Sequence, residues 1–306
     1  MVDDSNQRIL PFGGDDARRV PEREARVAIL PVPYEGTVSY GGGASQGPGA
    51  ILAASDQLEM YDEELDVSID EVGFTTLLPP GFPPDASPEA VMASIRAAAL
   101  PALQQGKWLL TLGGEHSVTV GVLEAMIQHR GPTFSILQID AHADLRQSYQ
   151  GSPLSHACVM ARVHDMGLPF VQVGIRAVCA EERAFIRAHG LEDNVFWDHQ
   201  LAVTHRDRWM EEVVAKLGEE VYVTFDLDGL DPAIMPATGT PVPGGLSWLV
   251  ATRLLRKVAE ARRIIGADIT ELAPIPGLHA PDFLAARLAF KLVGYSLLGS
   301  LDESLS

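Results

Sequence analysis

The chain alternates between short apolar segments that favour strands and longer segments that favour helices. Strands are expected at residues 27–33, 108–112, 134–139, 170–173, 195–197, 220–225 and 263–269, and helices at about 50–65, 88–105, 117–129, 153–163, 180–189, 205–217, 247–262 and 282–298. Because parallel strands need a crossover between them, this alternation predicts an α/β fold. Its central sheet should be mainly parallel, with helices on both faces.

No break in composition, internal repeat or low-complexity tract divides the 306 residues. That length allows one large domain or two ordinary ones, and a hydrophobic content of 46% is enough for a sizeable core. Residues 1–25 are polar and charged, so we expect an N-terminal arm that packs poorly. Residues 26–306 then form a single domain.

The chain is strongly acidic, with 23 basic and 41 acidic residues and a formal net charge of −18. Such a surface repels phosphate backbones, so no nucleic-acid partner is expected. No apolar run approaches the roughly 18 residues of a membrane span, and the acidic N-terminus shows no signal peptide. The two cysteines, Cys158 and Cys179, fit a reducing compartment. We therefore expect a cytoplasmic protein without a membrane partner.

One predicted strand, residues 134–139, ends in three possible metal ligands, Asp140, His142 and Asp144. Side chains two residues apart point the same way along an extended chain, so all three could face one divalent cation. The alternative is a polar loop in which His142 bonds to a neighbouring carboxylate.

Two other predicted strands end in similar residues. Two glycines and then His116 follow residues 108–112, and a histidine there could also serve as a helix cap. Asp226 and Asp228 follow residues 220–225, whereas Asp231 precedes a proline and suits a turn. Since ligands of parallel sheets bind at the carboxyl ends of strands, these side chains are expected to lie close together.

A fourth strand end, at residues 267–274, carries Asp268 and Glu271. The first three ends together supply two histidines and four carboxylates, which would repel one another without added positive charge. Two divalent cations would supply that charge, and oxygen ligands with some imidazole favour Mn²⁺ over Zn²⁺. Water between two such cations loses a proton near neutral pH, so the expected reaction class is hydrolysis.

Three segments together resemble the ureohydrolase (arginase/agmatinase) family. They are Leu112-Gly-Gly-Glu-His-Ser-Val-Thr-Val120, Ile136-Leu-Gln-Ile-Asp-Ala-His-Ala-Asp144 and Thr224-Phe-Asp-Leu-Asp-Gly-Leu-Asp-Pro-Ala233, and the resemblance extends from residue 31 to about 295. It implies a three-layer α/β/α sandwich with two Mn²⁺ at the strand ends; Ni²⁺ or Co²⁺ would fit the same ligands. Family members assemble as trimers or hexamers, so a homo-oligomer is expected.

The resemblance also implies roles for individual residues. His116 and Asp144 would bind one metal ion, and His142 and Asp228 the other. Asp140 and Asp226 would bridge the two, so the three ligands from Asp140 to Asp144 must diverge rather than share one face.

Two further roles follow from the resemblance. Glu271 would pair with the substrate guanidinium, and His156 would shuttle protons. From its position near a helix start alone, His156 could also be structural.

The substrate implied is a small cationic guanidino compound. Arg146 stands where arginases carry an asparagine for the amino-acid head group, and the agmatinase-like loop at 33–40 points the same way. Hydrolysis of agmatine to putrescine and urea is expected. Guanidinobutyrate, guanidinopropionate, arginine or guanidine would be alternatives.

Two residues, Ala157 and Tyr40, differ from those found in many relatives, so the residues that contact the substrate tail stay unassigned. A non-catalytic binding protein on the same fold is a further alternative, although it would not need six ligands.

Overall fold

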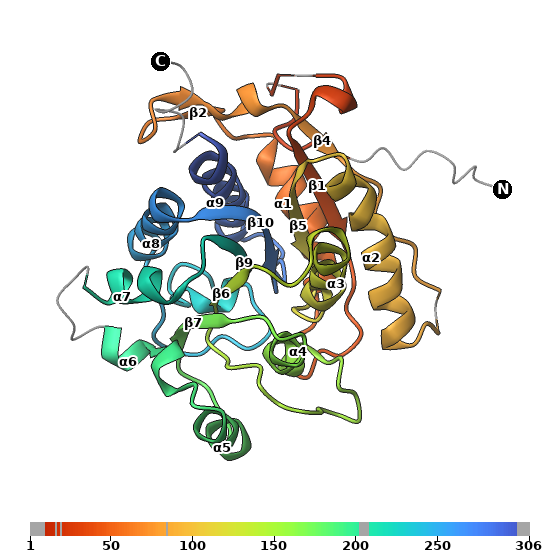
Figure 1. Cartoon of the computed structure of the whole chain (residues 1–306). Coiled ribbons are helices and arrows are strands. Elements are labelled where there is room, and N and C mark those ends of the chain that lie inside the picture. Colours follow the sequence, from red (N-terminus) through yellow and green to blue (C-terminus); the bar gives the residue numbers. More distant parts are fainter. Residues whose placement is uncertain (1–9, 16, 19, 84, 202–207, 299–306) are drawn as a thin grey trace.

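The computed structural model describes residues 10–15, 17–18, 20–83, 85–201 and 208–298. Within these residues lies a sheet of eight strands in the order β4-β1-β5-β10-β9-β6-β7-β8, and every pairing in it is parallel (Figure 1). The strands are β1 (Val27–Val32), β4 (Phe74–Thr76), β5 (Trp108–Gly113), β6 (Ser135–Ile139), β7 (Phe170–Ile175), β8 (Val195–Trp197), β9 (Glu220–Asp226) and β10 (Arg263–Thr270). The predicted parallel sheet is confirmed.

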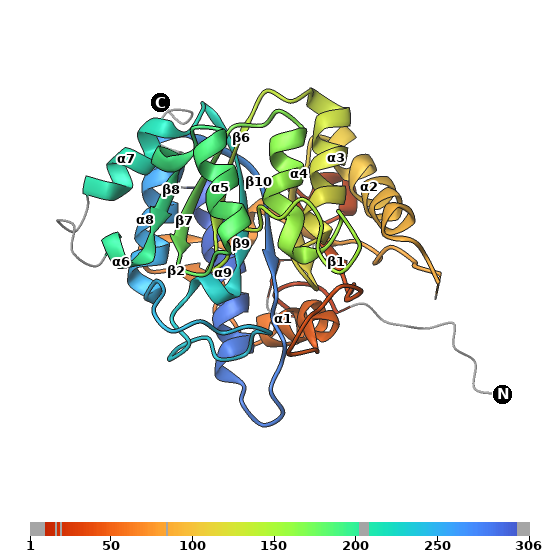
Figure 2. The same cartoon turned by 90° about the horizontal axis from the view of Figure 1, so that it is seen from below.

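Helices cover both faces of the sheet (Figures 1 and 2). One face packs against α1 (Gly47–Ser55), α7 (Arg208–Lys216), α8 (Trp248–Ala261) and α9 (Ala280–Leu297), and the other against α2 (Pro88–Gln104), α3 (Val118–Arg130), α4 (Val159–Asp165) and α5 (Ala180–Ala188). Each face of the sheet has its own hydrophobic core. Consecutive residues of a strand pack into different cores, as Ile29 and Leu30 of β1 do. The fold is therefore the predicted three-layer α/β/α sandwich. None of the described helices is long and apolar enough to cross a membrane.

The predicted helix at 50–65 is wrong in its second half. Helix α1 ends at Ser55, and β2 (Tyr61–Asp62) and β3 (Val67–Ser68) then form an antiparallel hairpin. The buried carboxylate of Asp62 accepts hydrogen bonds from the backbone N–H groups of Glu64 and Leu65, at 2.9 and 3.0 Å. Such bonds from an aspartate to the next residues favour a turn over a helix.

Two other differences are smaller. Strand β4 was not predicted, because three residues at the edge of a sheet give little periodic signal. The helix expected at 153–163 begins at Val159, after a 3₁₀ turn at His156–Cys158. The predicted cap of α2 is confirmed, since Ser87 accepts a hydrogen bond from the N–H of Ala90.

Part of the N-terminal segment packs on the domain. Phe12 is buried against Phe74, with ring centroids 5.2 Å apart, and its N–H donates to Thr76 Oγ1. Residues 1–9, 16 and 19 lie outside the described residues. The division into an arm at 1–25 and a single domain at 26–306 stays a prediction.

A buried ion pair connects the β2–β3 hairpin to α9. Lys291 Nζ lies 2.9 Å from Asp62 Oδ2 and 3.1 Å from Glu64 Oε2, and both Lys291 and Asp62 are buried. We expect Lys291→Ala to lower the free energy of unfolding by about 3–5 kcal/mol, because it leaves the buried carboxylate of Asp62 without its cation. Urea denaturation followed by circular dichroism measures this change.

Arg208→Ala is the control, because Arg208 pairs with Glu212 at an exposed site on α7. It should leave the denaturation midpoint almost unchanged. Equal midpoints for the two variants would show that the hairpin does not depend on the Lys291 ion pair.

Candidate metal centre

The candidate site lies over the carboxyl ends of four adjacent strands, β5, β10, β9 and β6. The turn after β5 is tight because glycine lets another backbone approach. A Cβ on Gly114 would lie 2.0 Å from the carbonyl oxygen of Tyr34. Gly114 also donates its N–H to Val32 and accepts from the N–H of Glu271. The loop after β5 is thus held between the ends of β1 and β10, and it presents His116.

The imidazole of His116 is buried and has a defined tautomer. Its Nε2 lies 2.8 Å from Thr224 Oγ1, and the Thr224 hydroxyl donates to Asp268 Oδ1 at 2.7 Å. Since the only hydroxyl hydrogen of Thr224 goes to Asp268, Nε2 of His116 must be the protonated nitrogen. Whenever the ring is neutral, Nδ1 therefore carries the lone pair. Burial alone would lower the pKa of His116, but Asp140 and Asp144 raise it well above its usual value, so a proton and a cation compete for this nitrogen. Asp268, noted from the sequence without a role, supports His116 through Thr224.

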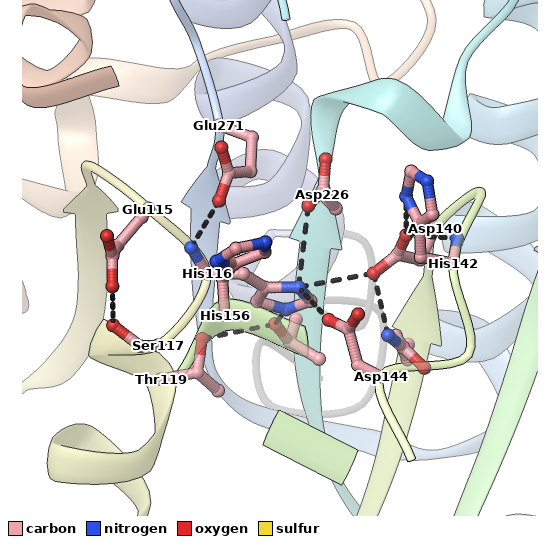
Figure 3. Close-up of polar contacts among 12 residues, drawn as sticks. Glu115, His116, Ser117, Thr119, Asp140, His142, Asp144, His156, Asp226 and Glu271 are labelled. Atoms are coloured by element: carbon pink, nitrogen blue, oxygen red, sulfur yellow. Dashed lines mark hydrogen bonds and ion pairs between the residues drawn. The ribbon is translucent and has the colours of Figure 1, made fainter. Parts of the chain in front are cut away.

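Three carboxylates surround that lone pair (Figure 3). Nδ1 of His116 lies 3.1 Å from Asp140 Oδ2, 3.0 Å from Asp144 Oδ2 and 3.4 Å from Asp226 Oδ2. It is buried and makes no hydrogen bond of acceptable geometry within the described chain. A nitrogen that faces several carboxylate oxygens without a hydrogen bond of good geometry fits a bound cation, which would displace any proton there.

Asp140 lies between two groups of potential ligands. Its Oδ2 faces His116, whereas its Oδ1 lies 3.7 Å from Nδ1 of His142, which in turn is 2.9 Å from Asp228 Oδ2. Among the described residues, His116, Asp140 and Asp226 form one possible metal-binding group, and Asp140, His142 and Asp228 form another. Gln138 Nε2 donates to Asp140 Oδ2 and fixes its orientation. The two oxygens of Asp140 are thus placed to serve two different ions.

Two site residues adopt left-handed backbone conformations that non-glycine residues rarely take. Asp144 has φ 51° and Glu271 has φ 67°. The carbonyl of Asp144 accepts from the N–H groups of Met160 and Ala161, and Glu271 Oε1 accepts from the N–H of His116 at 2.6 Å. These contacts hold the strained backbone in place, and such strain is common at functional sites.

The shifted pKa values of the cluster show that its negative charges repel one another and favour bound positive charge. Burial raises the pKa of Asp144 to about 7, and the neighbouring Asp140 adds to that shift. Burial also raises the pKa of Glu271 to about 8, with a contribution from Glu115. For His142, burial alone would lower the pKa, but Asp140 and Asp228 outweigh it and raise the pKa to about 11. Divalent cations in the cluster would relieve this repulsion.

The predicted residues come together in one place. A cavity of about 190 Å³ is lined by His116, His142, Asp144, His156, Asp226, Asp228 and Glu271. Asp140 is fully buried and is not among the residues that line the cavity in the described chain. Asp231 is not in this group: its side chain accepts from the N–H of Ala233 in a turn, as its place before a proline suggests.

Some supporting residues were missed from the sequence. Glu115 is buried and accepts hydrogen bonds from the backbone N–H groups of Gly36 and Thr37 in the glycine-rich loop. The sequence feature that could have identified Glu115 is its position directly before His116 at a strand end. Thr37, Thr224 and Gln138 gave no signal, because single polar residues in loops and strands are common.

Comparison with solved structures identifies the class of fold. Agmatine ureohydrolase of Thermoplasma volcanium superposes with a TM-score of 0.81 and 28% identity, over 95% of each chain. The molecule is thus an arginase-like α/β/α protein.

Sequence comparisons identify the family. An arginase family profile matches residues 25–294. The chain is 40% identical to N(1)-aminopropylagmatine ureohydrolase of Synechocystis sp. over 277 residues, 89% of each chain. It is 35% identical to agmatinase of Pyrococcus horikoshii over 285 residues, which is 90% of this chain and 93% of that one. The chain belongs to the arginase family, and it is a ureohydrolase that acts on guanidino C–N bonds.

Removal of Asp140 should abolish metal binding and activity together, because both groups of ligands share this residue. We expect Asp140→Ala to purify with less than one tenth of the wild-type metal and to lose urea release in parallel. Elemental analysis and a urea assay on the same preparation measure both.

Asp231→Ala is the matched control, since it removes an aspartate near the end of β9 whose side chain accepts from Ala233 in a turn and belongs to neither group of potential ligands among the described residues. It should keep its metal. Full metal content and full turnover in Asp140→Ala would refute the assignment of this residue.

Proposed function

We propose that the chain hydrolyses the guanidinium group of a small, amine-tailed guanidine, with agmatine as the first candidate. The observation that carries this proposal is that Glu271 and His156 line the same cavity as the His116 and His142 clusters. A carboxylate, a proton-transferring imidazole and a set of metal ligands are thus within reach of one small substrate. The reaction consumes one water and yields urea and putrescine.

We assign His116 and Asp144 to one cation, His142 and Asp228 to the other, and Asp140 and Asp226 to positions between them. The free Nδ1 of His116 and the two-sided placement of Asp140 support this assignment. Six oxygen and imidazole ligands without a thiolate favour Mn²⁺, and Ni²⁺ or Co²⁺ would fit as well. When bound, such ions supply the Lewis acidity that gives water its nucleophilic form near neutral pH.

The remaining steps belong to residues of the chain. Glu271 places the planar guanidinium, since a carboxylate pairs with two of its N–H groups and fixes the central carbon. A C–O bond forms at that carbon, and the bond from the same carbon to the nitrogen that bears the alkyl chain breaks. Both protons of the consumed water end on the departing amine nitrogen, which leaves as an alkylammonium ion, and urea remains. His156 takes up one of these protons and passes it to that nitrogen.

A second candidate is N1-aminopropylagmatine, whose hydrolysis gives urea and the corresponding triamine. Two observations favour it: the name of the Synechocystis relative, and the mouth of the cavity. Tyr40 lines this mouth and is 86% exposed. Its ring face is available to an ammonium group on a longer tail through a cation–π contact.

A substrate panel tests the amine-tailed assignment, and the higher kcat/KM of agmatine or of N1-aminopropylagmatine within it decides between these two candidates. Purified protein with added Mn²⁺ or Ni²⁺ should release urea from agmatine or N1-aminopropylagmatine at least tenfold faster, in kcat/KM, than from arginine, guanidinobutyrate, guanidinopropionate or guanidine. Preference for a carboxylate-tailed guanidine would refute the amine-tailed assignment. Purified protein without bound or activating metal and without urea release would favour a binding protein.

The tail contact can be tested with Tyr40. We expect Tyr40→Ala to raise the KM for N1-aminopropylagmatine about three- to tenfold and to leave kcat nearly unchanged, because loss of an exposed cation–π contact costs about 0.5–1 kcal/mol plus some packing. Tyr40→Phe keeps the ring and is the control. Equal KM values in the two variants would exclude a role for the aromatic ring.

Glu271→Gln tests guanidinium binding separately from metal binding. The amide keeps an oxygen for the N–H of His116 but loses the charge that pairs with the substrate. We expect kcat/KM to fall roughly 10- to 150-fold, which corresponds to about 1.5–3 kcal/mol for a hydrogen bond to a charged group, with metal content unchanged. An unchanged kcat/KM would remove Glu271 from the substrate site.

We also propose a cytoplasmic homo-oligomer, either a trimer or a hexamer. Free Cys158 and Cys179 are consistent with a reducing compartment. Light scattering of the purified protein measures the assembly.

A further inference from the structure

A continuous set of hydrogen bonds connects Glu115 to His156 through Thr37. Oε1 of Glu115 accepts from the Thr37 hydroxyl at 2.7 Å, and Oε2 accepts from the N–H groups of Gly36 and Thr37 at 2.7 and 2.6 Å. Thr37 Oγ1 lies 3.1 Å from Nδ1 of His156 and 3.0 Å from its backbone N–H. Three segments that are distant in sequence therefore meet behind the imidazole of His156.

The direction of these bonds fixes the position of a proton. Four donors are directed at Glu115, the three named above and the Ser117 hydroxyl, so both of its oxygens are occupied as acceptors. The single hydroxyl hydrogen of Thr37 is thus used by Glu115. Thr37 Oγ1 can then only accept from His156. The Ser155 hydroxyl also lies near Nδ1, but at 3.4 Å it is more distant than Thr37 at 3.1 Å, so Nδ1 of His156 carries the hydrogen toward Thr37.

The other ring nitrogen is left for the reaction. Nε2 of His156 makes no hydrogen bond within the described part of the chain, and the residue lines the cavity. The ring is also held by Tyr149, which packs perpendicular to it with centroids 5.8 Å apart. Burial lowers the pKa of His156, which favours a neutral ring between proton transfers.

We infer that Thr37, held by Glu115, is a positioning residue that keeps His156 in the Nδ1–H tautomer, so that Nε2 exchanges the proton with the leaving amine. This inference rests on the proposed function. Thr37 acts from behind the ring, because the cavity is lined by Val38 but not, in the described chain, by Thr37. The glycine-rich loop thus has a part in proton transfer besides forming the wall of the cavity.

The kinetic test compares Thr37→Val, which loses the hydroxyl at nearly constant shape, with Thr37→Ser, which keeps it. We expect Thr37→Val to lower kcat by roughly 10- to 100-fold, within the range for loss of general acid–base catalysis, with little change in KM and in metal content. Thr37→Ser should restore most of kcat. Equal losses in the two variants, or a change confined to KM, would overturn the inference.

A double-mutant cycle tests whether Thr37 acts through His156. In a His156→Ala background, Thr37→Val should cause no further loss of kcat, because the imidazole that it positions is gone. A residue that only supports the loop would lower kcat by the same factor in both backgrounds, and that outcome would refute the positioning role.

A spectroscopic readout separates this inference from the proposed function. ¹⁵N-histidine spectra of the protein loaded with diamagnetic Zn²⁺ report the tautomer, and the signal missing in His156→Ala identifies His156 among the nine histidines. We expect an unprotonated Nε2 in the wild type and a shift toward protonated Nε2 in Thr37→Val. A wild type with Nε2–H would overturn the inference even if urea is released. An Nδ1–H signal without urea release from any substrate would refute the function alone.

Discussion

The crowding of four carboxylates around two histidines is the constraint on which the site depends. Asp140, Asp144 and Asp226 all lie within 3.4 Å of the same imidazole nitrogen, and all three are buried. In a site of low dielectric constant such a cluster is stable only with added positive charge. Protons can supply part of it, as the raised pKa values of Asp144 and Glu271 indicate. Two divalent cations would supply it more completely, and they would bring the chemistry of hydrolysis.

The fold places these groups with the precision that the chemistry needs. Neighbouring parallel strands bring Asp140 and Asp226 to one edge of the sheet, and a second set of residues then fixes their orientation. Asp268 acts on His116 through Thr224, and Glu115 acts on His156 through Thr37. In each pair a buried carboxylate takes the hydroxyl hydrogen of a threonine, so the threonine can only accept from the imidazole. This carboxylate–threonine–imidazole arrangement leaves Nδ1 of His116 available to a cation and Nε2 of His156 available for proton exchange.

The sequence predicted the parallel sheet and every residue of the cluster, because apolar periodicity and strand-end motifs are local signals. It did not predict the hairpin at residues 61–68, where Asp62 redirects the backbone and pairs with Lys291, 229 residues away. It also missed Thr37 and the role of Glu115, since their function exists only once the loop after β1 lies against the end of β5. Alternation along an extended strand would place Asp140, His142 and Asp144 on one face. The positive φ of Asp144 breaks this alternation, and hydrophobic periodicity carries no information on such a backbone conformation.

A metal titration of the wild type tests the central claim most directly. Metal-free protein is dialysed against increasing Mn²⁺, and bound ions and the rate of urea release are measured on the same samples. The account predicts two ions per chain at saturation, negligible activity without metal and full activity only when both ions are bound. Full activity with one ion or none, or saturation at a single ion, would contradict it.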